Sequence, residues 1–157
     1  MDVAGFASVI AAAAALFAVV ATFLIYRASR SELVYLEYTG RYRDALEELP
    51  SDFFGPQFSL ESVAEGTDLE QIQRSVHRYV DLCSEEVKLM IRSRVKPDVW
   101  HDWDEGIKSG LDAKAVKAIR DDSSWGRDYN VLEAYLRSGL RAARQEYHNQ
   151  RKMRRFP

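Results

Sequence analysis

Residues 3–26 of this 157-residue chain read VAGFASVIAAAAALFAVVATFLIY. The stretch holds no charged residue and no proline, and as a helix it would extend roughly 36 Å at about 1.5 Å per residue. The hydrocarbon core of a bilayer is about 30 Å thick, so such a helix can cross it with some tilt. The acidic start, Met1-Asp2, and the length of the run argue against a cleaved signal peptide. Residues 1–26 are therefore predicted to be a transmembrane anchor.

Positive charge follows the apolar stretch and does not precede it. Arg27 and Arg30 come directly after it, and Arg41 and Arg43 lie a little further on. Lysine and arginine next to a membrane span are retained on the cytoplasmic side. The sequence thus predicts a single-pass protein of the plasma membrane with its N-terminus outside and its C-terminal domain in the cytoplasm.

Small residues recur at every fourth position of the apolar stretch, as in Ala14, Ala18 and Thr22. This spacing lets two membrane helices approach closely, so it suggests a homo- or hetero-oligomer formed through the alanine-rich helix. The alternative is that the run of alanines at residues 11–15 creates the spacing without any such contact.

The helical period continues beyond the membrane. Residues 27–49 contain no proline, and Pro50 would end a helix. Apolar and aromatic residues recur there every three or four positions, at Tyr35, Tyr38, Tyr42, Leu46 and Leu49. The anchor is therefore expected to continue as a helical stalk over residues 27–49.

Residues 50–136 are predicted to form a small helical cytoplasmic domain. Residues 50–67 read as a loop whose Phe53, Phe54 and Phe58 are expected to cover the core, the alternative being that they face a partner, and Thr67 with Glu70 forms a capping-box pattern. Helical periodicity predicts helices over residues 69–95, 97–110, 113–120 and 127–150, with a turn at residues 123–126 that carries Trp125. No stretch alternates with period two, so the fold class is all-α: a transmembrane helix, a stalk and a small helical bundle.

Three residues with reactive or aromatic side chains are predicted to lie in the core. Cys83 is the single cysteine, which excludes an intrachain disulfide, and it falls on the apolar face of its helix. Trp100 and Trp103 precede Ile107 at helical spacing, which is typical of a buried face rather than a ligand cage.

The histidines invite a catalytic or metal-binding interpretation that the sequence does not support. His101 shares a helix face with Asp98 and Glu105, but a helical carboxylate metal site needs Glu-x-x-His motifs, which are absent. An exposed acidic face is the better interpretation, and His77 with Asp81 reads as a surface pair. Nucleotide-binding, hydrolase and zinc-protease motifs are also absent, so no enzyme and no cofactor is predicted.

The charge is distributed unevenly along the chain. Residues 1–136 carry 15 Lys/Arg and 23 Asp/Glu, whereas residues 137–157 carry seven Lys/Arg and one acidic residue. The predicted basic helix and tail could contact anionic lipid, the protein's own acidic body or an acidic partner, whereas the acidic body argues against nucleic acid. The residues expected to make this contact are Arg137, Arg141, Arg144, Arg151, Lys152, Arg154 and Arg155. The first four are expected on one narrow face of a continuous helix, which carries Leu132, Leu136 and Leu140 on its apolar face.

Two segments resemble a known group of proteins. Residues 78–83, RYVDLC, and residues 99–107, VWHDWDEGI, are similar to uncharacterised bacterial membrane proteins with one N-terminal transmembrane helix and a small helical domain. The resemblance implies a bacterial inner-membrane protein and carries no known activity. The basic tail after Leu140 is not part of the pattern.

The sequence therefore favours a non-enzymatic interaction protein, such as an accessory subunit or scaffold of a membrane assembly. The alternative is a small membrane-tethered sensor or effector that binds a ligand or anionic lipid. A pocket lined by several ionisable groups would favour the alternative, and a solid core with a charged or aromatic surface would favour the first.

Overall fold

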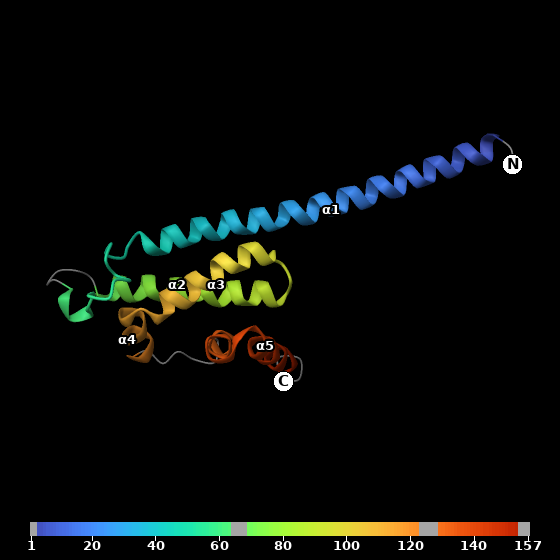
Figure 1. The fold of residues 1–157 in the computed structure, drawn as a ribbon. Helices are drawn as coiled ribbons and strands as arrows, with labels where there is room; N and C mark the ends of the chain where they lie inside the picture. The colour runs from blue at the N-terminus through green and yellow to red at the C-terminus, as the bar shows by residue number, and fades with distance from the viewer. Residues whose placement is uncertain (1–2, 64–68, 123–128, 154–157) are drawn as a thin grey trace. The chain divides into compact units, whose positions relative to one another are not determined.

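The computed structural model describes residues 3–63, 69–122 and 129–153, without the side chains of residues 3–13, 27, 28, 31, 62, 121 and 122. In this part of the chain every regular element is a helix (Figure 1). The elements are α1 (Val3–Leu46), the short 3-10 helix η1 (Leu60–Ser62), α2 (Leu69–Ile91), α3 (Pro97–Asp112), α4 (Lys114–Asp122) and α5 (Asn130–Met153). The all-α prediction is confirmed. The predicted capping box at Thr67 and the turn carrying Trp125 fall outside the described residues.

The chain divides into two compact units, Met1–Leu36 and Glu37–Pro157. In the first unit, the N-terminal part of α1 exposes its large apolar side chains from Leu16 to Tyr26, each by between 48% and 76%. Among the helices of the described residues, none contains a stretch both long and apolar enough to cross a membrane. The span predicted over residues 3–26 falls partly on residues 3–13, whose side chains lie outside the described residues.

The second unit begins inside the stretch predicted as a stalk. Tyr38 and Ala45, on the last turns of α1, are buried. The following loop turns back over the core, and Phe53 and Phe58 are buried in it as predicted, while Phe54 is more exposed. The three phenylalanine rings contact one another, with the Phe53 centroid 5.1 and 5.0 Å from those of Phe54 and Phe58.

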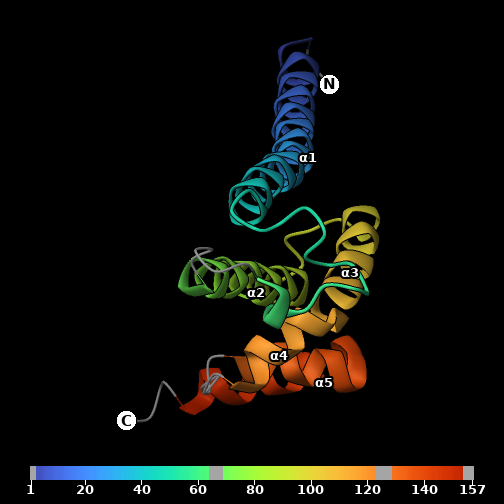
Figure 2. The same ribbon diagram turned by 90° about the vertical axis from the view of Figure 1, so that its left-hand side faces the viewer.

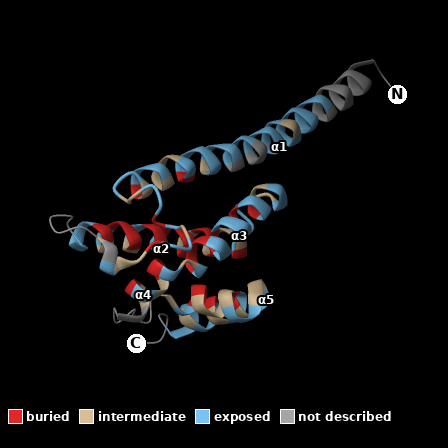
Figure 3. Ribbon diagram, turned by 60° about the vertical axis from the view of Figure 1, so that its left-hand side comes forward, coloured by how far each residue is buried: buried red, intermediate tan, exposed pale blue. Residues whose placement is uncertain are grey.

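Helix α2 is the centre of this unit, and α3, α4 and α5 all pack against it (Figures 1 and 2). Burial is concentrated along α2 (Figure 3). Its buried side chains recur every three or four residues, as expected for a helix that faces neighbours on more than one side. The apolar ones are Ile72, Val76, Tyr79, Val80, Leu82, Cys83, Val87 and Ile91.

Helix α3 begins at Pro97, where a proline costs no hydrogen bond, and buries Trp100, Trp103 and Ile107 as predicted. Gly110 does not end this helix, which continues to Asp112. Glycine is required at position 110 for steric reasons, because a Cβ atom there would lie 1.8 Å from the Tyr79 hydroxyl oxygen. The absence of a side chain at position 110 thus allows α3 to approach α2 closely.

Helix α5 is not the continuous helix that the sequence predicted. Gly139 interrupts it with φ 76° and ψ −173°, a conformation that is essentially restricted to glycine. The buried face changes at this point: Val131, Leu132 and Tyr135 are buried before the break, and Ala143 and Tyr147 after it. Leu136 and Leu140, predicted on the apolar face, are only half-buried.

Candidate functional site

The basic residues predicted near the C-terminus divide at Gly139. Arg137 lies before the break, and its guanidinium is 3.3 Å from the Glu133 carboxylate. Arg141, Arg144, Arg151 and Lys152 lie after it and are exposed. Because the helix is interrupted, the four predicted arginines do not share one continuous helix face. Arg154 and Arg155 fall outside the described residues.

The segment after Gly139 is attached to α2 through Tyr147. The Arg92 side chain donates a 2.6 Å hydrogen bond from Nε to the Tyr147 hydroxyl, and its guanidinium carbon lies 5.2 Å from the centre of that ring. The guanidinium carbon of Arg151 lies 6.0 Å from the same centre. Two arginines therefore lie within about 6 Å of the centre of one tyrosine ring, a favourable cation–π distance for each.

The turn between α2 and α3 adds positive charge beside this contact. The amide of Ser93 bonds to the Met90 carbonyl, and the amide of Arg94 bonds to the Leu89 carbonyl at 3.0 Å. With Ser93 at φ 53°, this is a Schellman ending of a helix. Residues 87–97 contain four basic residues and no acidic one. This short basic segment could have been found in the sequence, but the charge summed over residues 1–136 is negative and does not reveal it.

We call the basic corner the basic side chains that lie within five residues of the Arg92–Tyr147 contact, in the turn and in the end of α5. It consists of Arg92, Arg94 and Lys96 with Arg144, Arg151 and Lys152. Among the described residues, none of these six side chains forms an ion pair with a carboxylate. Of the residues predicted to contact an acidic surface, Arg137 pairs with Glu133 of residues 1–136, one turn earlier in the same helix.

A second cluster is buried where α1 meets α2. The Tyr42 hydroxyl donates a 2.7 Å hydrogen bond to Oε2 of Glu86 and lies 3.5 Å from the Cys83 sulfur. Glu86 is fully buried, and within the described part of the chain its Oε1 has no hydrogen-bond partner. Burial raises the pKa of Glu86 from its usual 4.5 to about 8, against the opposing effect of the Tyr42 bond. The carboxyl group is therefore mostly neutral at pH 7.

The thiol in this cluster is not a nucleophile. Burial raises the pKa of Cys83 from 9 to about 12, so the thiolate is scarcely populated at neutral pH. Burial also raises the pKa of Tyr42 and of Tyr79 above the usual 10. The prediction that Cys83 is a buried core residue is confirmed.

At the edge of this contact, charged groups hold α1 against α2. The Tyr38 hydroxyl and the Arg41 guanidinium donate to Oε2 of Glu85 at 2.7 and 2.8 Å. Just beyond the end of α1, Glu48 accepts a 2.6 Å bond from the Ser75 hydroxyl. These contacts explain why the last turns of α1 belong to the second unit.

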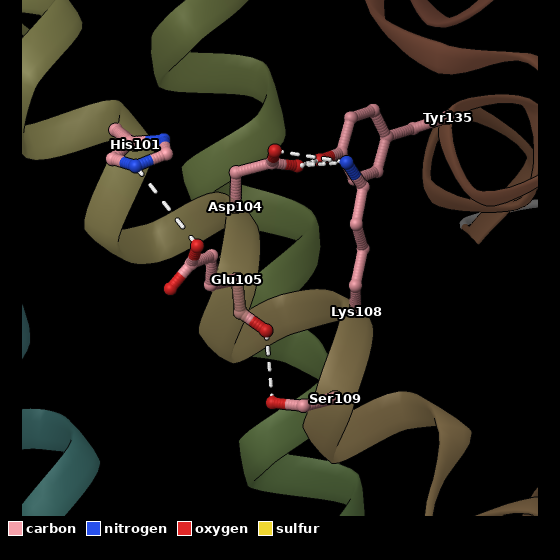
Figure 4. Close-up of polar contacts among 6 residues, drawn as sticks. All are labelled: His101, Asp104, Glu105, Lys108, Ser109 and Tyr135. Atoms are coloured by element: carbon pink, nitrogen blue, oxygen red, sulfur yellow. Dashed lines mark hydrogen bonds and ion pairs between the residues drawn. The ribbon is translucent and has the colours of Figure 1, made fainter.

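The His101 cluster is an exposed helix face, as the sequence indicated (Figure 4). His101 Nε2 lies 3.9 Å from Oε1 of Glu105, and the two side chains are 74% and 77% exposed. Asp104, one turn along, instead links helices: it accepts from Lys108 at 2.8 Å and from the Tyr135 hydroxyl of α5. The remaining bond in Figure 4 joins the Ser109 hydroxyl to the Glu105 carbonyl.

In the described part of the chain, no three His, Cys, Asp or Glu side chains are grouped so that they could hold a metal ion. His77 and Asp81, which were predicted to form a surface pair, do not form a metal site either. His77 is half-buried, and Asp81 accepts a 2.5 Å hydrogen bond from the Tyr129 hydroxyl. These carboxylates connect helices and do not converge on a shared point.

Two surface hollows are lined by ionisable groups. One, of about 510 Å³, lies against α3 and α4, and the other, of about 560 Å³, lies between α1 and α2. In the first, Lys117 is bonded to Asp112 at 2.5 Å. In the second, Arg41 is paired with Glu85. Because these cations already have carboxylate partners, neither hollow offers them as uncompensated charges to a ligand.

Comparisons of the chain with models of protein families, with curated proteins and with solved structures found no match.

Proposed function

We propose that this chain is a membrane-anchored, non-enzymatic interaction protein of the bacterial inner membrane. The observation that carries the proposal is the apolar surface of residues 14–26, which is exposed around the whole circumference of α1. A helix that is apolar on all sides requires an apolar environment, such as the bilayer or a protein core. The aliphatic hydroxyl in this stretch, that of Thr22, donates within the helix to the Ala18 carbonyl at 2.8 Å, as a helix in lipid requires.

Carbonate extraction of membranes tests the anchor. Leu16→Arg/Leu24→Arg should release the chain or prevent its insertion, because an arginine near the centre of a span, as at position 16, costs about 3 kcal/mol, and the second arginine shortens the apolar stretch. The matched control is Leu33→Arg/Leu36→Arg, since these leucines are exposed to a similar extent but follow Arg27 and Arg30. The control should stay in the membrane. Extraction of the unaltered chain by carbonate would refute the anchor.

The orientation can be tested separately. Arg27 and Arg30 support a cytoplasmic C-terminus, so a C-terminal alkaline phosphatase fusion should be inactive and a fluorescent-protein fusion bright. An active phosphatase fusion would reverse the topology.

The interaction function is supported by the described contacts of the second unit. Its buried side chains form a core around α2, and buried Glu86 and Ser75 of α2 are bonded to Tyr42 of α1 and to Glu48 just beyond α1. Affinity purification in mild detergent followed by mass spectrometry should recover a stoichiometric partner or a second copy of the chain. The small residues Ala14 and Ala18 would carry a contact between membrane helices, so replacing both with leucine should weaken such an oligomer.

A further inference from the structure

We propose that the basic corner is a binding surface for an anionic bilayer, formed jointly by the α2–α3 turn and the end of α5. This inference rests on the proposed membrane anchor. It extends the predicted C-terminal basic tail to a second element of the fold, and it assigns Arg92, Arg94 and Lys96 to the contact.

The first argument is geometric. Arg92 of the α2–α3 turn and Arg151 of α5 both approach the Tyr147 ring, with guanidinium carbons 5.2 and 6.0 Å from its centre. Both side chains are exposed. Guanidinium groups bind phosphate through paired hydrogen bonds, so lipid phosphates are suitable ligands for them.

The second argument is the contrast with other cations of the same unit. Within the described residues, six basic side chains elsewhere have a carboxylate within 4 Å: Arg41, Arg78, Lys108, Lys117, Arg120 and Arg137. The six side chains of the basic corner have no such partner among the described residues. Six cations without a carboxylate partner in the described part of the chain therefore lie in the two segments that the Arg92–Tyr147 contact joins, which gives charge complementarity to an anionic surface.

A bilayer fits this place better than an acidic protein does. Only residues 27–36 separate the proposed membrane segment from the unit that begins at Glu37, so the unit as a whole is tethered to the lipid surface and its effective concentration there is high. Met153 follows Lys152 and is 66% exposed. An apolar side chain beside basic ones is typical of segments that lie at a membrane surface.

The test measures how close the corner lies to lipid in the full chain reconstituted into nanodiscs. Met153→Cys provides a selective site for a fluorescent label, because Cys83 is completely buried. Energy transfer to an acceptor dye on the lipids should be higher with phosphatidylglycerol present than with phosphatidylcholine alone. The difference should disappear at about 0.5 M salt, where exposed charges are screened within a few ångströms.

The variant Arg94→Gln/Lys96→Gln removes two charges of the turn and leaves the Arg92–Tyr147 contact intact. It should lower the equilibrium constant for binding of the basic corner to the anionic bilayer about thirtyfold, because each of the two lost charges accounts for a factor of about five. Arg43→Gln/Lys114→Gln is the matched control, with the same change in charge at exposed positions outside the corner, and it should behave as the unaltered chain.

The outcomes separate the two proposals. If the chain does not co-elute with nanodiscs, the membrane anchor fails, and the inference that depends on it fails as well. If the chain co-elutes but energy transfer is the same in both lipids, the anchor stands and the lipid surface is refuted, which leaves an acidic protein as the partner. If the turn variant responds like the control, the α2–α3 turn is not part of the surface.

Discussion

The Tyr42 hydroxyl donates a 2.7 Å hydrogen bond to the buried carboxyl group of Glu86, which links the end of α1 to the middle of α2. The acceptor is unusual because Glu86 is fully buried and has no cation within the described contacts. Its pKa is raised to about 8, chiefly by burial. A neutral carboxyl group is compatible with such a place, whereas a carboxylate is not.

The stability of the second unit should therefore fall as the pH rises. In the unfolded chain Glu86 titrates near its usual pKa of 4.5, and in the folded chain near 8. Between these values the folded state holds a proton that the unfolded state has lost, so the stabilisation is full below about pH 4.5 and is lost as the pH approaches 8. Glu86→Gln should remove this dependence.

Thermal unfolding of the full chain in detergent from pH 5 to 9 measures the effect. Glu86→Gln should unfold at a higher temperature than the unaltered chain at pH 9 and at a similar temperature at pH 5. Glu105→Gln is the control, since this carboxylate is 77% exposed, and it should follow the unaltered chain. Parallel pH curves for the unaltered chain and Glu86→Gln would show that Glu86 is not the titrating group.

Trp103→Ala should destabilise the second unit by about 3–5 kcal/mol, because it leaves a large cavity in the core. The Trp103 ring is buried, with its centre 5.4 Å from that of Tyr38. Chemical denaturation monitored by circular dichroism would measure the loss. His101→Ala, on the exposed face of the same helix, should change the stability by less than about 1 kcal/mol. Equal effects of the two substitutions would contradict the assigned burial.

Gly110→Ala should cost about 1–3 kcal/mol, because the added Cβ would lie 1.8 Å from the Tyr79 hydroxyl oxygen. Tyr79→Phe in the same chain should restore part of the loss, although it also removes the hydrogen bond to the Gly106 carbonyl. Gly106→Ala is the matched control. No atom lies within 4 Å of its added Cβ, so alanine should be tolerated or slightly stabilising. The double-mutant cycle in thermal unfolding would give the coupling between positions 79 and 110.

Ser93→Gly should stabilise the chain by about 0.5–1 kcal/mol, because Ser93 has φ 53° and glycine adopts this conformation without a steric penalty. The same substitution at Ser109, inside α3, should destabilise, since glycine is a poor helix former. Thermal unfolding of both variants compares the two directly. A loss of stability at position 93 would mean that the left-handed conformation is not maintained in solution.

The helical spacing of apolar residues predicted which side chains of the helices are buried. The stripe on α2, the burial of Trp100 and Trp103 and the role of Phe53 could be predicted because apolar residues recur at helical spacing or lie next to a core. Gly139 could not be identified as a break in the same way. A single glycine within an amphipathic pattern costs only about 1 kcal/mol in a helix, so its conformation depends on how the two flanking segments pack.

Two polar features could not be predicted, for different reasons. Glu86 lies three residues after Cys83 and seven after Tyr79, so the helical period favours the buried face, but its charge suggests solvent. The basic run at residues 87–97 is visible in the sequence. Its position beside the end of α5 depends on the Arg92–Tyr147 contact, which joins residues far apart in the chain.

The close approach of Gly110 to Tyr79 has a consequence for evolution. The two positions share one volume, because the phenol ring occupies the space that a side chain at position 110 would need. A related chain with a larger residue at position 110 must therefore carry a shorter one at position 79. In an alignment of relatives these two positions should vary together, and the pair would then identify the α2–α3 packing in chains whose overall similarity is low.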